Sequence, residues 1–379
     1  MKTICKKIPL KEIATFLNGY AFKPSDWSKE GLPIIRIQNL TGTNKEFNYY
    51  NGKYNEKYII ENGDILISWS ASLGIFLWEN MRGILNQHIF KVIFDKNIEI
   101  DKTYFLHCMK YLIKKMEKNI HGSTMKHITR PEFEKINFPI YEIDIQRKFS
   151  KNLIFITKII ENNKKLLDEL VELCKSLFTM MFGDPLSNNK KEWNFFKIKD
   201  IGKIISGSTP STNIPEYWNG EYLWITPAEL NDDSFIINST NRKLTYLGVK
   251  ASSLTELPIG TVLLSSRAPI GKVAIVGENM FCNQGFKNII PNEKINSIYL
   301  YYLFKEKKEY LNFLGRGATF KELSKEIVEN ISIKVPPIEL QNKFAERIEK
   351  IEKLKFEIEK SIETAQNLYD SLISKYFDN

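Results

Sequence analysis

The chain has 379 residues, which allows two to four domains at about 100–200 residues per domain. Apolar residues make up 43% and charged residues 26%, a balance that excludes wholesale disorder and permits a sizeable core. The net charge of +9 favours a polyanionic partner, although a solvated lysine-rich surface would give the same surplus.

Cysteine usage and hydropathy exclude several other classes of protein. The four cysteines are scattered without a C-x-x-C pair, which is typical of a reduced intracellular protein: Cys5, Cys108, Cys174 and Cys282. The first residues lack the apolar run of a secretory signal, and the longest apolar-looking stretch, 67–78, is far too short to cross a bilayer. We therefore expect a cytoplasmic protein with no membrane association.

Residues 1–143 predict a compact mixed α/β domain. Short β-like runs are punctuated by Gly, Asn and Pro, and one helical stretch follows them at Lys102–Lys118. The clearest runs are Ile34–Leu40, Gly63–Ser68 and Ile89–Phe94.

Residues 144–182 predict one long helix, followed by a linker at 183–192. Apolar residues recur at alternating spacings of four and three, a period of 3.5 that indicates a coiled-coil seam. This seam includes Leu153, Ile156, Ile160, Asn163, Leu167 and Leu170. Gly183 is expected to end the helix, which would span about 50 Å at 1.5 Å per residue.

Residues 193–338 predict a second domain of the same kind, and 339–379 a second long helix. The β-like runs include Tyr222–Thr226 and Gly260–Ser266, and a helical stretch is expected at Ser297–Leu314. The second seam has the same spacing and includes Ile348, Ile351, Lys355, Ile358, Ile362 and Tyr369. Asn163 and Lys355 each place a polar group on a seam, and we expect them to fix register at some cost in stability.

The chain is an internal duplication. IDIQRKF at Ile143–Phe149 returns as IELQNKF at Ile338–Phe344, and GSTMK at Gly122–Lys126 returns as GATFK at Gly317–Lys321, both 195 residues later. GDILISWSASLG and GTVLLSSRAPIG match at an offset of 197. We therefore predict two tandem α/β domains whose long helices pair as an antiparallel coiled coil with pseudo-two-fold symmetry. The alternative is that each helix lies on its own domain.

The positive charge is confined to the two predicted domains. Residues 1–143 carry a net +6 and 193–338 a net +3, whereas the two helices together are neutral. A polyanion would therefore be bound by the domains, and the helices would separate them.

Motifs for catalysis or for a metal are missing from the sequence. There is no phosphate-binding G-x-x-x-x-G-K-[ST] loop, and the one Pro-Pro pair follows Val335 instead of the Asn or Asp of an amino-methyltransferase motif. All four histidines lie in the first domain (His88, His107, His121 and His127), so core or surface roles are favoured over a metal site. We expect a non-catalytic chain that binds no metal or cofactor.

The sequence resembles the specificity subunit of type I restriction–modification enzymes over nearly its full length. The segments Gly19–Leu40 and Leu85–Val92 resemble one class of that family's target recognition domain. Ser206–Pro210, Ser265–Ile275 and Asn283–Ile289 resemble another class. SLFTMMFGDP at Ser176–Pro185 resembles the junction after the family's first conserved helix.

The resemblance implies two target recognition domains that each bind one half of a bipartite double-stranded DNA site, separated by two antiparallel helices. It also implies two modification subunits that methylate adenine N6 with S-adenosylmethionine, and restriction subunits that translocate and cleave DNA with ATP and Mg²⁺. All of that chemistry would belong to the partners.

Base recognition requires side chains that donate and accept hydrogen bonds at base edges. The candidates in the first domain are Arg36, Gln38, Ser68, Trp69, Ser70, Asn86, Gln87, His88 and Lys126. Those in the second are Ser208, Thr209, Thr226, Ser266, Arg267, Asn283, Gln284, Arg316 and Lys321. The asparagine–glutamine pairs could instead cap buried backbone groups, and Trp69 could belong to the core.

Two other functions remain open from the sequence. One is a self-contained nuclease or methyltransferase with an unrecognised site, and the other is a coiled-coil scaffold for protein or RNA.

Overall fold

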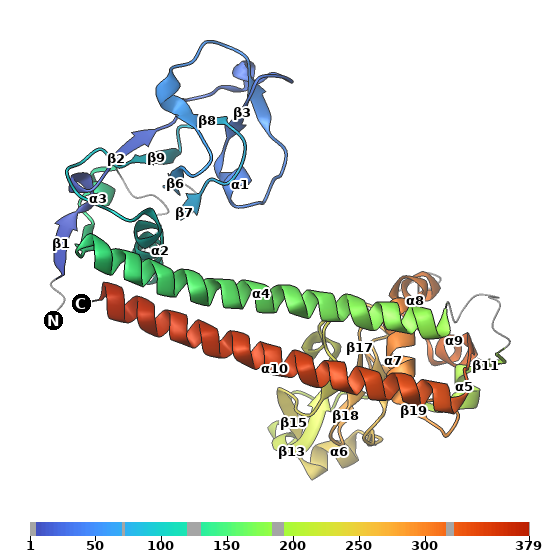
Figure 1. Ribbon diagram of the computed structural model, residues 1–379. Coiled ribbons are helices and arrows are strands. Elements are labelled where there is room, and N and C mark those ends of the chain that lie inside the picture. The colour runs from blue at the N-terminus through green and yellow to red at the C-terminus, as the bar shows by residue number, and fades with distance from the viewer. Residues whose placement is uncertain (1–4, 70–72, 120–129, 184–192, 316–321, 379) are drawn as a thin grey trace. The chain divides into compact units, whose positions relative to one another are not determined.

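The computed structural model describes residues 5–69, 73–119, 130–183, 193–315 and 322–378 (Figure 1). The chain forms two compact units: unit 1 comprises residues 1–164 and 360–379, and unit 2 comprises residues 165–359. Each unit contains one globular region and part of each of two long helices.

Two four-stranded sheets form the globular region of unit 1. The first sheet is antiparallel, with the strand order β2 (Thr15–Asn18), β9 (Ile89–Ile93), β6 (Ile65–Ser68) and β7 (Gly74–Leu77). The second has the order β4 (Asn48–Tyr50), β3 (Leu32–Ile35), β8 (Gly83–Leu85) and β5 (Ile59–Ile60), and β3 and β8 are parallel. A separate ribbon pairs β1 (Lys6–Pro9) with β10 (Asn137–Ile140).

The helices of unit 1 are α1 (Ile37–Leu40), α2 (Lys102–Asn119), α3 (Arg130–Glu134), the first part of α4 (Ile143–Phe182) and the last part of α10 (Ile338–Phe377). Tyr104 and Phe105 of α2 are fully buried against the first sheet and the ends of the long helices. This packing joins the globular region to the helical pair.

Unit 2 repeats this plan of two sheets with different numbers and lengths of strands. Its larger sheet has the order β12 (Gly202–Ser206), β19 (Lys287–Pro291), β16 (Val262–Leu264), β17 (Val273–Val276) and β14 (Ile236–Ile237). Its smaller sheet has the order β15 (Arg242–Leu244), β13 (Trp218–Ile225) and β18 (Phe281–Cys282), and β13 and β18 are parallel. β11 (Phe195–Lys197) pairs with β20 (Ser332–Lys334).

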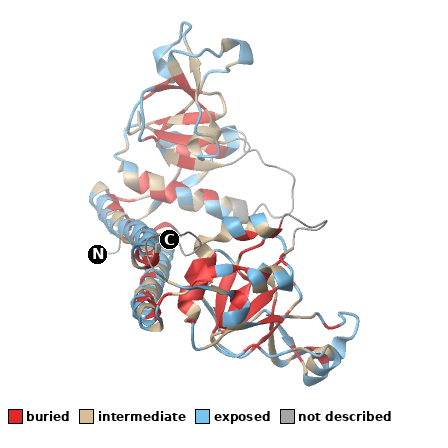
Figure 2. Ribbon diagram, turned by 90° about the vertical axis from the view of Figure 1, so that its right-hand side faces the viewer, coloured by how far each residue is buried: buried red, intermediate tan, exposed pale blue. Residues whose placement is uncertain are grey.

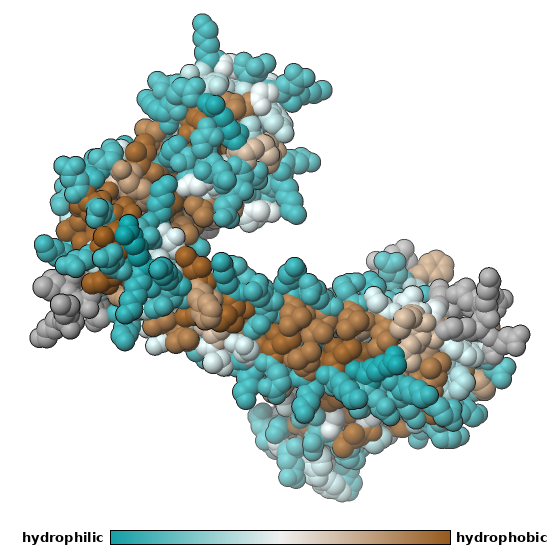
Figure 3. Space-filling model, in the orientation of Figure 1, coloured by the Kyte–Doolittle hydropathy of each residue, from teal (hydrophilic) through white to brown (hydrophobic). Residues whose placement is uncertain are grey.

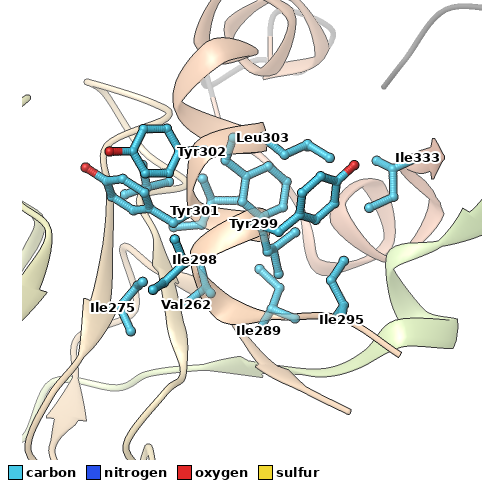
Figure 4. Close-up of a cluster of buried hydrophobic side chains, with 14 of the residues drawn as sticks. Val262, Ile275, Ile289, Ile295, Ile298, Tyr299, Tyr301, Tyr302, Leu303 and Ile333 are labelled. Atoms are coloured by element: carbon cyan, nitrogen blue, oxygen red, sulfur yellow. The ribbon is translucent and has the colours of Figure 1, made fainter. Parts of the chain in front are cut away.

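The short helices of unit 2 are α5 (Ile198–Ile201), α6 (Tyr246–Ala251), α7 (Ser297–Glu306), α8 (Lys308–Leu314) and α9 (Lys325–Asn330). Figure 4 shows α7 laid on the larger sheet, where Ile298 and Tyr299 pack among Val262, Ile275 and Ile289. Figure 2 shows that buried residues gather on the sheets and on the helix faces that cover them.

Hydrogen bonds made by equivalent residues confirm the duplication. Buried Gln146 donates from Nε2 to the carbonyl of Tyr141 at 2.7 Å, and buried Gln341 donates in the same way to the carbonyl of Pro336 at 2.7 Å. The Oε1 atom of each glutamine accepts a backbone N–H, at 3.0 Å for Gln146 and 2.8 Å for Gln341. The same network therefore fastens each long helix to its globular region.

The predicted pairing of the long helices is also confirmed. In unit 1 the ring of Phe149, near the start of α4, stacks on that of Tyr376, near the end of α10, with centroids 3.6 Å apart. In unit 2 Phe178 and Phe182, near the end of α4, contact Phe344, near the start of α10. The two helices are therefore antiparallel, as the sequence predicts.

Residues at the predicted seam positions are buried or half-buried. Leu153, Ile156, Ile160, Leu170, Ile348 and Ile358 are buried, and Asn163, Leu167, Ile351, Lys355, Ile362 and Tyr369 are half-buried. Asn163 Nδ2 donates to Ser361 Oγ across the pair at 3.0 Å, whereas Lys355 Nζ pairs with Glu352 on its own helix at 3.0 Å.

Two predicted elements differ in the structure. The expected strand over Ile34–Leu40 ends at Ile35, because Asn39 Oδ1 accepts the N–H of Arg36 at 3.0 Å and caps a helical turn. The helix expected from Ser297 breaks at Lys307, whose ψ of 22° is not helical. Gly183, with φ of +69°, follows the last residue of α4 as expected.

Other features of the described residues bear on the class of protein. The four cysteines are unpaired. No described helix is long and apolar enough to cross a membrane.

Candidate nucleic-acid interface

In unit 1 three strands end side by side, and a predicted contact residue follows each of them. Arg36 follows β3, Trp69 follows β6 and Asn86 follows β8. The N–H of Asn86 donates to the carbonyl of Ile35 at 3.1 Å, and the N–H of Trp69 points to the carbonyl of His88 at 3.4 Å. The structure therefore brings together residues that are up to about 50 positions apart in the sequence.

Several polar atoms at or beside these strand ends, and one at the end of β2, are buried without a partner. They are Asn18 Oδ1, Arg36 Nε, Trp69 Nε1 and His88 Nδ1, and one more such atom, Asn288 Oδ1, occurs in unit 2 among the described residues. Buried polar atoms are nearly always paired, by protein or by water, so each unpaired atom calls for an explanation. Their concentration at one set of strand ends fits a surface that is completed by a ligand.

Aromatic rings surround these polar groups. The rings of Trp69 and His88 meet edge to face with centroids 5.6 Å apart, and His88 Nε2 lies 3.2 Å from Gln87 Nε2. The Arg36 guanidinium lies over the ring of Trp27, 5.2 Å from its centroid. Gln38 is half-buried on the short helix α1, beside Arg36.

Unit 2 holds its predicted contact residues in the same way. Thr226 follows β13, and Asn283 follows β18 and donates its N–H to the carbonyl of Ile225 at 3.1 Å, the counterpart of the bond from Asn86 to Ile35. Thr226 also donates its N–H to Glu229 Oε1 at 2.9 Å, which matches the bond from Arg36 to Asn39. The two units thus present different side chains on one backbone plan.

A glycine in each unit permits this close approach. A Cβ atom on Gly19 would lie 2.2 Å from the carbonyl oxygen of Leu85, and one on Gly207 would lie 2.0 Å from that of Cys282. No other residue fits at either position unless the backbone moves. Glycine is therefore required where the neighbouring strand ends are brought together.

Hydrogen bonds hold the segment of unit 2 that contains Ser208 and Thr209. Thr209 Oγ1 donates to Gln284 Oε1, and both residues are exposed. The carbonyl of Ser208 accepts the indole N–H of Trp224 at 3.1 Å. Beneath them burial raises the pKa of the Cys282 thiol to about 12, so this cysteine stays protonated and its role is structural.

Two predicted contact residues are buried. Ser68 and Ser266 have no exposed surface, and Ser266 Oγ donates to the carbonyl of Gly285 at 3.0 Å. We therefore expect them to hold their neighbours in place. Ser70, Lys126, Arg316 and Lys321 lie outside the described residues.

Three features were not anticipated from the sequence. Arg242 lies over the ring of Trp218, 3.6 Å from its centroid, and over that of Trp224 at 5.2 Å. Glu322 pairs with Arg267, their Oε2 and Nε atoms 3.1 Å apart. Tyr20, Phe22, Tyr50 and Tyr58 form an aromatic cluster in unit 1. The density of aromatic residues in 217–224 was a usable signal for the first of these; the other two depend on long-range contacts.

The long helices carry a second apolar row beside their seam. In unit 2 Leu166, Leu173 and Met180 recur every seven residues on α4 and are 39%, 49% and 69% exposed. Leu354 on α10 is 47% exposed. Figure 3 shows apolar side chains gathered along the two helices. An exposed apolar row of this kind offers a surface that another chain could cover.

Comparison with known proteins places the chain in a family. The model of the type I restriction modification DNA specificity domain matches twice, at residues 5–172 and 190–365. The EcoBI specificity subunit of Escherichia coli is 21% identical over 98% of this chain and 85% of its own length. The MjaIX specificity subunit of Methanocaldococcus jannaschii is 49% identical over 158 residues, which are 41% of this chain and only 37% of that protein.

Solved structures share the fold. The type I S subunit from M. genitalium matches with a TM-score of 0.64 at 14% identity, covering 99% of this chain and 96% of that one. A chain from a structural study of assembly in the type I R-M system matches with a TM-score of 0.60 at 15% identity, covering 99% and 98%. With two matched domains and a shared architecture, the chain belongs to the type I restriction modification DNA specificity family.

Proposed function

We propose that this chain is the DNA-recognition subunit of a type I restriction–modification enzyme, and that it performs no chemistry of its own. Each globular region would bind one half of a bipartite double-stranded site. The chain would direct adenine N6-methylation and ATP-dependent cleavage by its partner subunits in the cytoplasm, and S-adenosylmethionine, ATP and Mg²⁺ would be bound by those partners.

The observation that carries this proposal is the equivalence of the two sets of strand ends. The backbone hydrogen bond between Asn86 and Ile35 in unit 1 recurs between Asn283 and Ile225 in unit 2. Two different groups of polar side chains are therefore carried by the same backbone arrangement. A duplicated support with diverged side chains suits a DNA site with two unlike halves. The globular regions also carry the whole net positive charge, which suits contact with phosphates.

The helices support the assignment of partners. Because the second apolar row lies outside the seam of the pair, it remains available to another chain. We assign this second apolar row to the modification subunits, which need a fixed binding surface near each half-site. A membrane has no part in this proposal.

The test is to map methylated adenines in the genome of the host with and without this gene. We expect one bipartite motif with a gap of fixed length, which is lost when the gene is deleted. An unchanged methylation pattern would contradict the proposal, as would methylation or cleavage of DNA by the purified chain alone. The latter outcome would favour a self-contained enzyme.

A further inference from the structure

The backbone next to Arg267 in unit 2 is held in place by hydrogen bonds. It lies in the connection between β16 and β17, and its neighbour Ser266 is buried. The N–H of Ser266 donates to the carbonyl of Gly285 at 2.8 Å, and the carbonyl of Ser266 accepts the N–H of Leu323 at 2.9 Å. The backbone that carries the Arg267 side chain is therefore held by both hydrogen-bonding groups of Ser266.

The side chain itself is oriented by a carboxylate. Glu322 Oε2 lies 3.1 Å from Arg267 Nε, and Oε1 of the same carboxylate lies 3.3 Å from Lys287 Nζ. The Lys287 side chain is only 9% exposed and that of Glu322 is 29% exposed. The buried ammonium thus compensates the charge of Glu322, which would otherwise repel DNA phosphates.

Because Glu322 contacts the Arg267 guanidinium at Nε, the two terminal nitrogens of the guanidinium can donate to another acceptor. Arg267 is 51% exposed, and among the described residues Glu322 is the one side chain that pairs with it. A planar fork with two terminal N–H groups matches O6 and N7 of guanine in the major groove. A guanidinium that rotates freely would contact a phosphate as well as a base. One that is held in a single orientation suits the edge of a base.

We propose that Arg267 recognises a guanine in the half-site of unit 2, and that Glu322 is the positioning residue that orients its fork. This inference rests on the proposed function. The sequence has Ser70 at the position that matches Arg267 in the first copy, so the guanine contact belongs to one half-site only.

The experiment uses the full chain assembled with its modification subunits and a library of DNA with randomised half-sites. Methylated molecules are sequenced to give the base preference at each position. For the Arg267→Ala variant, which has no donor, we expect the preference for guanine at one position of one half-site to fall by about 5- to 150-fold, which corresponds to 1–3 kcal/mol for a bidentate contact. The other half-site should be unchanged.

Glu322→Gln should lower the preference at the same position while total DNA binding persists, because the guanidinium is no longer oriented by a charge. The matched control is Arg82→Ala, which removes an exposed arginine that pairs with Glu56 and Glu61 in unit 1 and should leave both half-sites unchanged. Thermal unfolding of each variant confirms that it is folded.

The outcomes separate the two proposals. A wild-type complex without any sequence preference overturns the proposed function. A wild-type bipartite motif that Arg267→Ala leaves intact overturns the inference alone. Uniformly weaker binding to all sequences, with a salt dependence reduced by about one ion, would make Arg267 a phosphate contact and also overturn the inference.

Discussion

At the scale of single residues, the charge state of His107 is set by burial. The ring lies on α2, it is 6% exposed, and its Nδ1 is 2.8 Å from Tyr369 Oη. Burial, with a smaller effect of Lys110, lowers the pKa of His107 to about 4, and Asp101 opposes this shift weakly. The neutral ring is therefore part of the contact between α2 and the end of α10.

This shift predicts a pH-dependent stability. The unfolded chain binds a proton at His107 near pH 6.5, whereas the folded chain does not until about pH 4, so the free energy of unfolding falls as the pH drops between these values. The loss is at most about 3 kcal/mol at 1.36 kcal/mol per pH unit. Urea unfolding of wild type and His107→Gln at pH 7 and pH 4.5 should show a smaller loss in the variant. Equal losses would mean that His107 does not titrate in this way.

The sequence identified many of the residues that converge at the strand ends but not their surroundings. Asn86 and Asn283 were found because they recur in both copies. Ser68 recurs as Ser265, yet both are buried, since a pattern of recurrence does not distinguish a support from a contact. Glu322 was missed because its partner Arg267 lies 55 residues earlier, and no local pattern encodes that distance.

At the scale of elements, the period of 3.5 predicted the helical pair because a coiled-coil seam is written in local spacing. Short strands depend more on their surroundings: the run from Ile34 to Leu40 has the composition of a strand, but the Asn39 side chain converts its second half into a helical turn. The exposed apolar row on α4 was not predicted, because its role depends on contact with another chain.

Asn163 tests how the register of the pair is fixed. Replacing it by leucine removes the bond to Ser361 and places an apolar side chain on the seam. We expect Asn163→Leu to raise the thermal unfolding temperature and to add a second species in size-exclusion chromatography, because alternative registers are no longer penalised. An unchanged unfolding temperature together with a single unchanged species would remove this role.

The second apolar row predicts where the modification subunits bind. Leu173→Gln should weaken their binding to the full chain by about 10- to 100-fold, which corresponds to about 1.5–3 kcal/mol for one buried leucine. Titration calorimetry measures the dissociation constant. Glu161→Gln, an exposed residue of α4 outside the row, is the control and should bind as wild type does. Equal affinities for the two variants would place the interface elsewhere.

At the scale of the whole molecule, we expect the helices to set the gap between the two half-sites. A heptad inserted after Lys164 in α4 and another after Glu359 in α10, where units 1 and 2 meet in each helix, preserves the phase of both seams. Each insertion adds about 10 Å of helix. Mapping of methylated adenines should then give a longer gap between unchanged half-sites. Altered half-sites, or the same gap, would argue against this division of roles.

Unit 1 is discontinuous, and this bears on how the polypeptide is made. Its core includes Ile373, Tyr376 and Phe377, which the ribosome adds long after the strands they cover, whereas unit 2 is one uninterrupted segment. During synthesis unit 2 can therefore fold before unit 1, because Phe149 and Tyr104 lack part of their cover until Tyr376 and Phe377 have been added. The folding of unit 1 thus depends on turns of α10 that are synthesised after the whole of unit 2.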